Sequence, residues 1–122
     1  MKVLYAEDDI MMQKLVVYQL IRYDHEVTTV DNGKEAIEVL EEATFDLVIL
    51  DIFMPRLSGI EVLQYIRQER KLNVPIIILS RDNHEEVQQK CFDLGANSFI
   101  HKPFHSKEFF LIIKKLTGHT VG

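Results

Sequence analysis

The chain is poor in the features that mark secreted or membrane-spanning proteins. Its 122 residues include a single cysteine, Cys91, which cannot form an internal disulfide. This favours a reducing compartment, so we expect a cytoplasmic location. No apolar run approaches the roughly 18 residues that a membrane span needs. Glu7 is acidic where a signal peptide would still be apolar. We therefore expect neither membrane insertion nor secretion.

The chain also lacks an excess of positive charge. Lys and Arg number 14 against 19 Asp and Glu, which gives a net charge of -5. Proteins that contact nucleic-acid phosphates present a basic face, so direct nucleic-acid contact is not expected. The apolar share of 47% and the charged share of 27% are instead typical of one folded domain. We predict that domain over residues 1–118, with 119–122 as a C-terminal tail or the start of a linker.

Short apolar runs alternate with segments of helical period. The predicted strands are 3–6, 27–30, 47–50, 74–79 and 98–100. The predicted helical faces are Met12, Val16, Leu20 and Tyr23; Ala36, Leu40 and Ala43; Ile60, Leu63 and Ile66; Val87, Cys91 and Leu94; and Phe109, Ile112 and Leu116. Strand and helix in alternation predict an α/β fold, with a parallel sheet covered by helices on both faces. Ligand sites in such folds lie beyond the carboxyl ends of the strands.

Acidic residues follow two of the predicted strands. Glu7, Asp8 and Asp9 come after the first strand, and Asp51 comes after the third. Carboxylates that converge raise one another's pKa unless a cation joins them. Oxygen ligands without neighbouring His or Cys favour Mg²⁺, so we predict a metal site here. The alternative is that the first three acids only cap the next helix, where its dipole favours them. Capping does not account for Asp51.

A hydroxyl and an ammonium group lie at the ends of the fourth and fifth predicted strands. Ser80 ends the fourth strand, and Lys102-Pro103 follows the fifth. An anionic group attached beside Asp51 would need such donors, because Lys supplies a compact charge and Ser a rotatable hydroxyl. Taken singly, Ser80 is equally well explained as a helix N-cap, and Lys102 as an ion-pair partner of the acids. The conjunction of all these groups at four strand ends favours a functional site.

These motifs resemble the receiver domain of two-component response regulators. They are Glu7-Asp8, Asp51 within the segment 50–59 (Leu-Asp-Ile-Phe-Met-Pro-Arg-Leu-Ser-Gly), Ser80, and the segment 99–104 (Phe-Ile-His-Lys-Pro-Phe). The likeness runs from Lys2 to about Leu116 and places the motifs at four strand ends in the family's order. It implies a flavodoxin-like fold of five parallel strands in the order 2-1-3-4-5, with five helices on both faces.

The resemblance also implies a chemistry for the strand ends. Asp51 would accept a phosphoryl group from a phosphohistidine on a partner histidine kinase or histidine phosphotransfer protein. Asp8, Asp51 and the backbone carbonyl of Phe53 would hold Mg²⁺, with Glu7 acting through water. Lys102 would bind a phosphoryl oxygen. Phosphoryl transfer depends on this kind of positioning and charge neutralisation.

A conformational switch is the output that the resemblance implies. Ser80 would move toward the phosphoryl group, and Phe99 would turn inward when the hydroxyl moves. The change would appear on the face formed by the fourth helix, fifth strand and fifth helix, for a downstream protein, an effector domain of the same chain, or a second copy in a phosphorylation-dependent homodimer. Such a domain is no ordinary enzyme, although it assists its own phosphorylation and slow dephosphorylation.

Two residues depart from the family's usual pattern. Arg81 follows Ser80 at a position where the family usually has a small residue, and either shields the phosphoryl group or points to solvent. Phe53 is apolar at a position that the family uses to tune the lifetime of the phosphate. Both departures concern rates rather than the ability to accept a phosphoryl group.

Four rival interpretations are weaker. An aspartyl phosphatase usually has a second Asp two residues after the nucleophile, where this chain has Phe53. A flavin carrier needs a loop of neutral donors after the first strand, where this chain has acids. A scaffold that is not phosphorylated would not need Asp51, Ser80 and Lys102 together. A transition-metal site at His101 and His105 would need a fixed geometry that the intervening proline turn does not assure.

Overall fold

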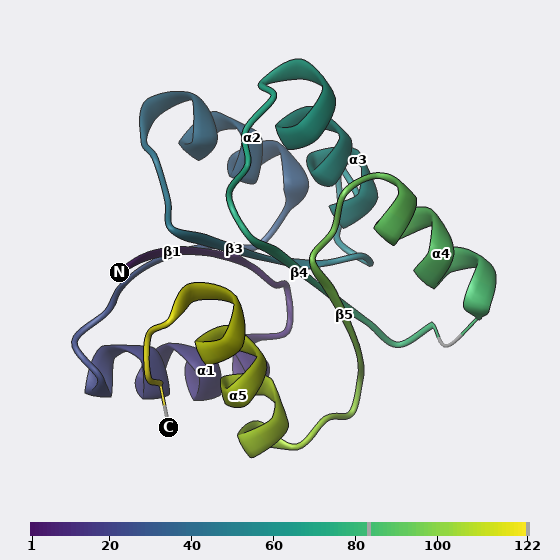
Figure 1. Ribbon diagram of the computed structural model, residues 1–122. Coiled ribbons are helices and arrows are strands. Elements are labelled where there is room, and N and C mark those ends of the chain that lie inside the picture. The colour runs from purple at the N-terminus through teal and green to yellow at the C-terminus, as the bar shows by residue number, and fades with distance from the viewer. Residues whose placement is uncertain (83, 122) are drawn as a thin grey trace.

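The protein is built around a five-stranded parallel sheet. The structure is a computed structural model that describes residues 1–82 and 84–121. The strands follow the order β2-β1-β3-β4-β5, as Figure 1 shows. Their bounds are β1 (Lys2–Ala6), β2 (Glu26–Val30), β3 (Leu47–Asp51), β4 (Ile76–Ser80) and β5 (Ser98–His101). The predicted fold class and strand order are confirmed.

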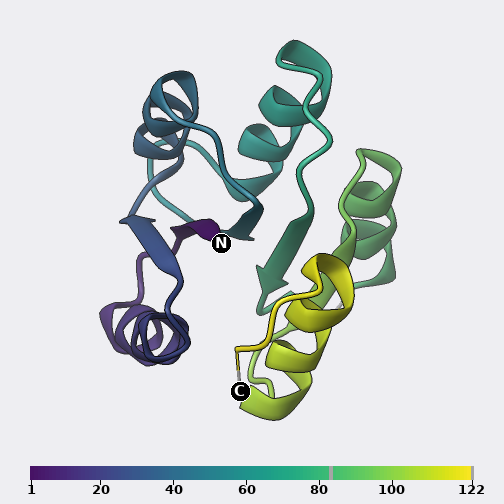
Figure 2. The same ribbon diagram turned by 60° about the vertical axis from the view of Figure 1, so that its left-hand side comes forward.

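Helices cover both faces of this sheet. They are α1 (Ile10–Arg22), α2 (Gly33–Glu42), α3 (Gly59–Gln64), α4 (Glu85–Asp93) and α5 (Ser106–Thr117), with a π-helical turn η1 (Tyr65–Glu69) that continues α3. Figures 1 and 2 show α1 and α5 on one face and α2, α3 and α4 on the other. None of the helices among the described residues is long and apolar enough to span a membrane.

The core divides into two layers because strand side chains alternate between the faces. In β3, Val48 and Leu50 pack toward α2, α3 and α4, whereas Leu47 and Ile49 pack toward α1 and α5. All five residues of β3 are buried, as expected for a strand covered on both faces. The buried strand therefore fixes the position of Asp51 at the carboxyl end of β3.

Side-chain hydrogen bonds to the backbone cap the first turns of α1 and α3. The Asp9 carboxylate accepts hydrogen bonds from the backbone N–H groups of Met11 and Met12 and caps α1. Ser58 and Glu61 form a capping box at the start of α3. The capping alternative for the first acidic cluster is thus correct for Asp9.

Some predicted details of the helices and strands are wrong. Tyr23 lies at the C-terminal cap of α1 and is 38% exposed, so it does not extend the buried face of that helix. In α5 it is Ile113 that is fully buried, whereas Ile112 is half-buried. The fourth strand begins at Ile76 rather than at position 74, after Pro75, which has no N–H to donate.

The residues after α5 turn back onto the domain. Gly118 ends α5 in the left-handed conformation, with φ of 78°. Val121 is then buried against the α1 and α5 layer. The carbonyl oxygen of Thr120 accepts a hydrogen bond from Nε2 of His25, at 2.9 Å. Gly122, the last residue of the predicted tail, lies outside the described residues, and the boundary between 118 and 119 stays a prediction.

Candidate phosphorylation site

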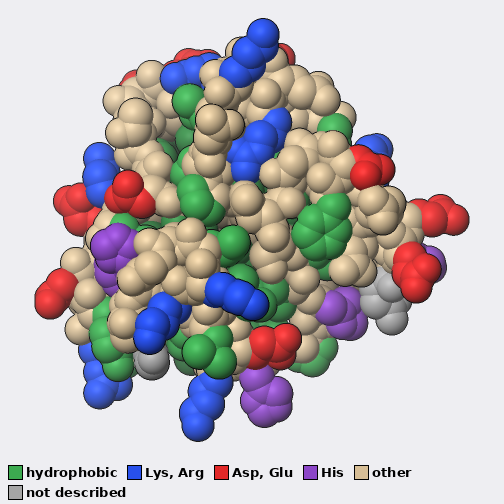
Figure 3. Space-filling model, in the orientation of Figure 1, with side chains coloured by type: hydrophobic (Ala, Val, Ile, Leu, Met, Phe, Trp, Pro, Cys, Tyr) green, Lys and Arg blue, Asp and Glu red, His purple; other side chains and the backbone are tan. Residues whose placement is uncertain are grey.

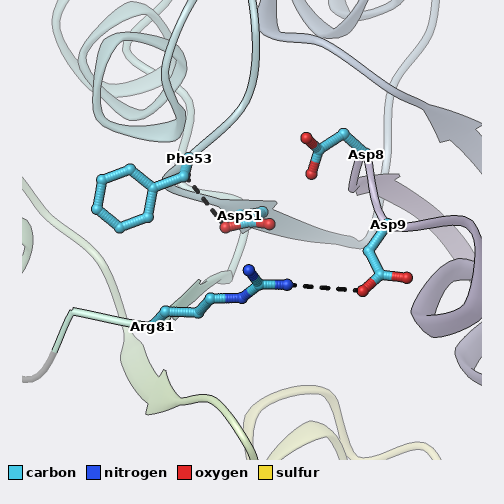
Figure 4. Close-up of a pocket in the computed structure, with 5 residues that line it drawn as sticks. All are labelled: Asp8, Asp9, Asp51, Phe53 and Arg81. Atoms are coloured by element: carbon cyan, nitrogen blue, oxygen red, sulfur yellow. Dashed lines mark hydrogen bonds and ion pairs between the residues drawn. The ribbon is translucent and has the colours of Figure 1, made fainter.

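The predicted site residues meet at one edge of the sheet. Asp51 ends β3 and Ser80 ends β4, and the strand register keeps these ends level, with Asp51 beside Leu79 and Ser80 beside His101. A pocket of about 560 Å³ opens at this edge and is lined by Asp8, Asp9, Asp51, Phe53 and Arg81. Figure 4 shows these side chains, which come from the end of β3 and from the loops that follow β1, β3 and β4.

Lys102 joins the acids beneath the pocket. Its Nζ donates to both carboxylate oxygens of Glu7, at 2.8 and 3.0 Å, and to Oδ2 of Asp51, at 2.9 Å. The lysine is only 6% exposed. Its backbone N–H donates to the carbonyl oxygen of Ser80, at 2.7 Å, which anchors the loop after β5 to β4. The ion-pair interpretation of Lys102 is therefore correct, and it is compatible with binding a phosphoryl oxygen.

Burial and crowding perturb the ionisation of Glu7. The residue is fully buried, and the phenol of Tyr5 donates to its Oε1 at 3.2 Å. Burial, a hydrogen bond with Asp51 and the charge of Asp51 raise the pKa of Glu7 to about 7, against the opposing effect of Lys102. Burial alone would lower the pKa of Lys102, but its bonds and charge attraction to the two acids raise it overall.

The acidic cluster fits a hard divalent cation. Oxygen atoms from Glu7, Asp8 and Asp51 lie within 4.8 Å of one another. This is the only group of three or more His, Cys, Asp or Glu able to hold a metal ion within residues 1–82 and 84–121. The set offers carboxylates alone, and Lys102 offsets only part of their charge, so the residues fit Mg²⁺. The His101 and His105 alternative receives no support.

The loop after β3 holds Asp51 from its own backbone. The N–H of Phe53 donates to Oδ1 of Asp51 at 3.1 Å, while the Phe53 ring is 55% exposed at the pocket. A Cβ atom on Gly59 would lie 2.3 Å from the carbonyl oxygen of Asp51, so only glycine permits this close approach of α3. The contact from the Phe53 backbone to Asp51 was not predicted from the sequence.

Ser80 and Phe99 lie in the sheet as predicted. Ser80 is fully buried, and its Oγ accepts a hydrogen bond from the N–H of Asp82 at 2.9 Å. Helix α4 begins after its N-cap residue His84, so the helix N-cap alternative for Ser80 is wrong. Phe99 is half-buried in β5 and packs against the core layer beneath α4.

Arg81 has a partner that the sequence did not reveal. Its Nη2 lies 3.7 Å from Oδ2 of Asp9, as the dashed line in Figure 4 marks. The Arg81 side chain is 73% exposed, but it extends across the pocket mouth. Acidic and basic side chains are scattered over the face in Figure 3.

Comparison with known proteins settles what this arrangement belongs to. Residues 3–114 match the family described as the response regulator receiver domain. The chain belongs to this family. Receiver domains are phosphoacceptors that histidine kinases phosphorylate, so this receiver domain takes part in phosphorylation-dependent signalling. The flavin-carrier and phosphatase interpretations are wrong.

Relatives of this receiver domain include longer regulators. It is 35% identical over 115 residues to the transcriptional regulatory protein ResD of Bacillus subtilis, covering 94% of this chain and 47% of ResD. It is 33% identical over 123 residues to the cell cycle transcriptional regulator CtrA of Caulobacter vibrioides, covering 98% and 53%. The chain thus spans about half the length of the curated relatives it matches.

Solved structures show the same fold. TrrA from Thermotoga maritima, in complex with Mg²⁺ and BeF, superposes with a TM-score of 0.82 at 32% identity, over 94% of this chain and 97% of that one. The receiver domain of the sensor histidine kinase PA1611 from Pseudomonas aeruginosa, with magnesium in its active-site cleft, gives 0.84 at 29%, over 96% and 97%. These neighbours and the acidic cluster together indicate a metal site.

Proposed function

We propose that Asp51 is the residue that accepts the phosphoryl group. One observation carries this assignment: the Asp51 carboxylate lies at the pocket, with one oxygen held by Lys102 and the other by the Phe53 N–H. A carboxylate held from both sides is oriented before the donor arrives, which is the main requirement of phosphoryl transfer.

The transfer forms a bond between an Asp51 oxygen and phosphorus and breaks the bond from phosphorus to the donor histidine nitrogen. Lys102 stays beside the phosphorylated Asp51 and donates to a phosphoryl oxygen in place of the lost aspartate charge. Bound Mg²⁺, held by Asp8, Asp51 and the Phe53 carbonyl with Glu7 acting through water, would neutralise the incoming oxygens. Water later releases the phosphate slowly, so the domain reverses its own signal.

The switch runs through Ser80 and Phe99. Ser80 gives up its contact with the Asp82 N–H and turns its hydroxyl toward the phosphoryl group. Phe99, which faces the core layer beneath α4, fills the space that this movement leaves. The population then shifts on the surface formed by α4, β5 and α5.

The partners follow from this chemistry. A histidine kinase or histidine phosphotransfer protein in the cytoplasm supplies the phosphoryl group. The switched surface binds a downstream protein, an effector domain of the same chain, or a second copy in a phosphorylation-dependent homodimer. The relatives named as transcriptional regulators support an effector output, because this chain covers only their receiver half.

Phosphorylation by a small donor tests the proposal directly. The protein is incubated with Mg²⁺ and acetyl phosphate, and its intact mass is measured. Wild type should gain one phosphate, and Asp51→Asn should gain none. Asp31→Asn is the matched control, because Asp31 is exposed after β2 at the same edge of the sheet. Equal labelling of wild type and Asp51→Asn would refute Asp51, and no labelling of wild type would support the scaffold alternative.

A further inference from the structure

Arg81 carries the one positive charge among the described residues that line the pocket over Asp51. Its side chain extends past the Asp51 carboxylate in Figure 4, and its guanidinium meets Asp9 on the other side of the pocket. The other nearby cation, Lys102, is buried beneath the pocket and already bonded to two carboxylates. An anion attached to Asp51 would therefore meet Arg81 on its outer side and Lys102 on its inner side.

The pair between Arg81 and Asp9 is loose enough to exchange. The two groups are 3.7 Å apart and both reach solvent, with side-chain exposures of 73% and 36%, and exposed pairs of this kind contribute little. Asp9 is also satisfied without Arg81, because its Oδ1 accepts the N–H groups of Met11 and Met12. Losing the arginine leaves the cap of α1 intact.

The backbone beneath Arg81 is held in place. Arg81 follows the buried Ser80, and its carbonyl oxygen accepts a hydrogen bond from Nε2 of His101, at 3.0 Å. Only the flexible side chain has to turn for the guanidinium to change partners. A guanidinium binds phosphate oxygens with two parallel hydrogen bonds, which its single loose contact with Asp9 does not match.

We propose that Arg81 exchanges Asp9 for the phosphoryl oxygens on Asp51 and protects the acyl phosphate from water. This inference rests on the proposed phosphorylation of Asp51. Hydrolysis joins the water oxygen to phosphorus and breaks the bond from phosphorus to Asp51. The products are the free Asp51 carboxylate and dihydrogen phosphate, which carries both protons of the water. Arg81 and the exposed Phe53 ring narrow the approach of that water, and Asp9 competes for the guanidinium.

The test times phosphate loss after the donor is removed, in constant Mg²⁺, by following the mass of the intact protein. Arg81→Ala should lose phosphate roughly three- to tenfold faster, the effect of losing about one hydrogen bond of ordinary net strength at an exposed position. Arg81→Lys should lie between the two, since an ammonium keeps the charge without the paired donors. An unchanged or slower rate in Arg81→Ala would overturn the inference.

Asp9→Asn supplies the matched second variant. Asparagine caps a helix as well as aspartate does, so α1 should keep its stability, while the competing charge is gone. Phosphate loss should slow in Asp9→Asn and should be as fast as in Arg81→Ala when both changes are combined. An effect of Asp9→Asn that persists without Arg81 would contradict the exchange of partners.

Two readouts separate this inference from the proposed function. The stoichiometry of labelling at Asp51 reports the proposed function alone, and wild type without label overturns both. Binding of beryllofluoride, a phosphoryl mimic, measured by calorimetry with Mg²⁺ present, reports the Arg81 contact without hydrolysis. Weaker binding to Arg81→Ala is expected, and equal binding together with equal phosphate loss would refute the role of Arg81 while leaving Asp51 as the phosphoacceptor.

Discussion

Two cations hold opposite edges of the same sheet, and their partners differ in kind. At the amino edge, the Arg67 guanidinium donates to the carbonyl oxygens of Gly95 (3.0 Å) and Leu72 (2.6 Å) and to the side-chain oxygen of Asn97 (3.0 Å). At the carboxyl edge, the Lys102 ammonium group donates to the carboxylates of Glu7 and Asp51. Both cations join segments distant in sequence, so connection alone does not distinguish a functional site.

The two edges differ in the net charge that remains around each cation once its hydrogen bonds are made. The acceptors around Arg67 are neutral, and the asparagine oxygen that it contacts also accepts the Ile76 N–H, at 2.8 Å. Around Lys102, three carboxylates face one ammonium group, which leaves a surplus of negative charge. A cluster that is bonded but not neutral stabilises an added cation, and this marks the carboxyl edge as the site.

The largest effect on stability is expected when the carboxyl edge, which carries the surplus negative charge, loses the ammonium group of Lys102. Lys102→Met leaves two buried carboxylates without their partner, and breaking a buried ion pair in this way costs about 3–5 kcal/mol. Urea unfolding without metal should show this loss. Lys114→Met, on the exposed side of α5, is the control and should change little. A loss below about 1 kcal/mol in Lys102→Met would mean that proton uptake by Glu7 compensates for the missing charge.

Removing the Arg67 charge at the amino edge should lower the stability of the protein without changing the phosphorylation site at the carboxyl edge. Arg67→Met removes three hydrogen bonds from a charged donor, so the free energy of unfolding should fall by about 2–3 kcal/mol. Mg²⁺ affinity and labelling by acetyl phosphate should stay at the wild-type level under native conditions. Calorimetric titration of Mg²⁺ checks this, and a marked loss of affinity would show that the two edges are coupled through β4 and β5.

The sequence predicted which edge of the sheet holds the candidate site, but not the contacts that Arg67 and Arg81 make. Residues at strand ends are placed by topology, so Asp51, Ser80 and Lys102 were found from their positions alone. Arg67 escaped prediction because its partners lie up to 30 residues away and are mostly backbone groups. The Arg81 and Asp9 pair escaped because it depends on the side-chain directions of two separate loops.

Tyr5 is a contact that the sequence did contain. It stands two residues before Glu7, and residues two apart on a strand point to the same face. The contact was not predicted because a tyrosine in an apolar strand is explained by core packing alone, and Tyr5 is fully buried. The prediction for Tyr23 was wrong because periodicity cannot show where a helix stops. Helix α1 ends at Arg22, one residue before Tyr23.

Mg²⁺ affinity should rise with pH at the charged edge. The pKa of Glu7 is raised from 4.5 to about 7, so without metal it holds a proton over much of the range below neutrality. A metal site needs its carboxylates ionised, and between pH 6 and pH 8 the ionised share of such a group grows about tenfold. Calorimetry should show affinity rising by about that factor.

Glu7→Gln provides the control for this pH dependence. The amide is close in shape and does not titrate, so its Mg²⁺ affinity should be nearly flat between pH 6 and pH 8. The sign for stability is opposite to that for affinity. A raised carboxyl pKa means that the metal-free folded state binds a proton that the unfolded chain has released, so stability should fall as pH rises from about 4.5 to about 7. A steep affinity profile in Glu7→Gln would assign the titration to another group.

The smallest expected effect concerns Tyr5. Tyr5→Phe removes the phenol that donates to Oε1 of Glu7 and leaves Lys102 as the donor to that oxygen. The ring keeps its packing, so the free energy of unfolding should fall by only about 1 kcal/mol. A hydrogen bond to the ionised carboxylate favours that form, so its loss should move the midpoint of the Mg²⁺ affinity profile to higher pH. Tyr65→Phe, at a half-buried tyrosine on the opposite face of the sheet, should leave the midpoint in place. A stability loss in Tyr5→Phe without a shifted midpoint would mean that the phenol supports the core alone and does not help to position Glu7.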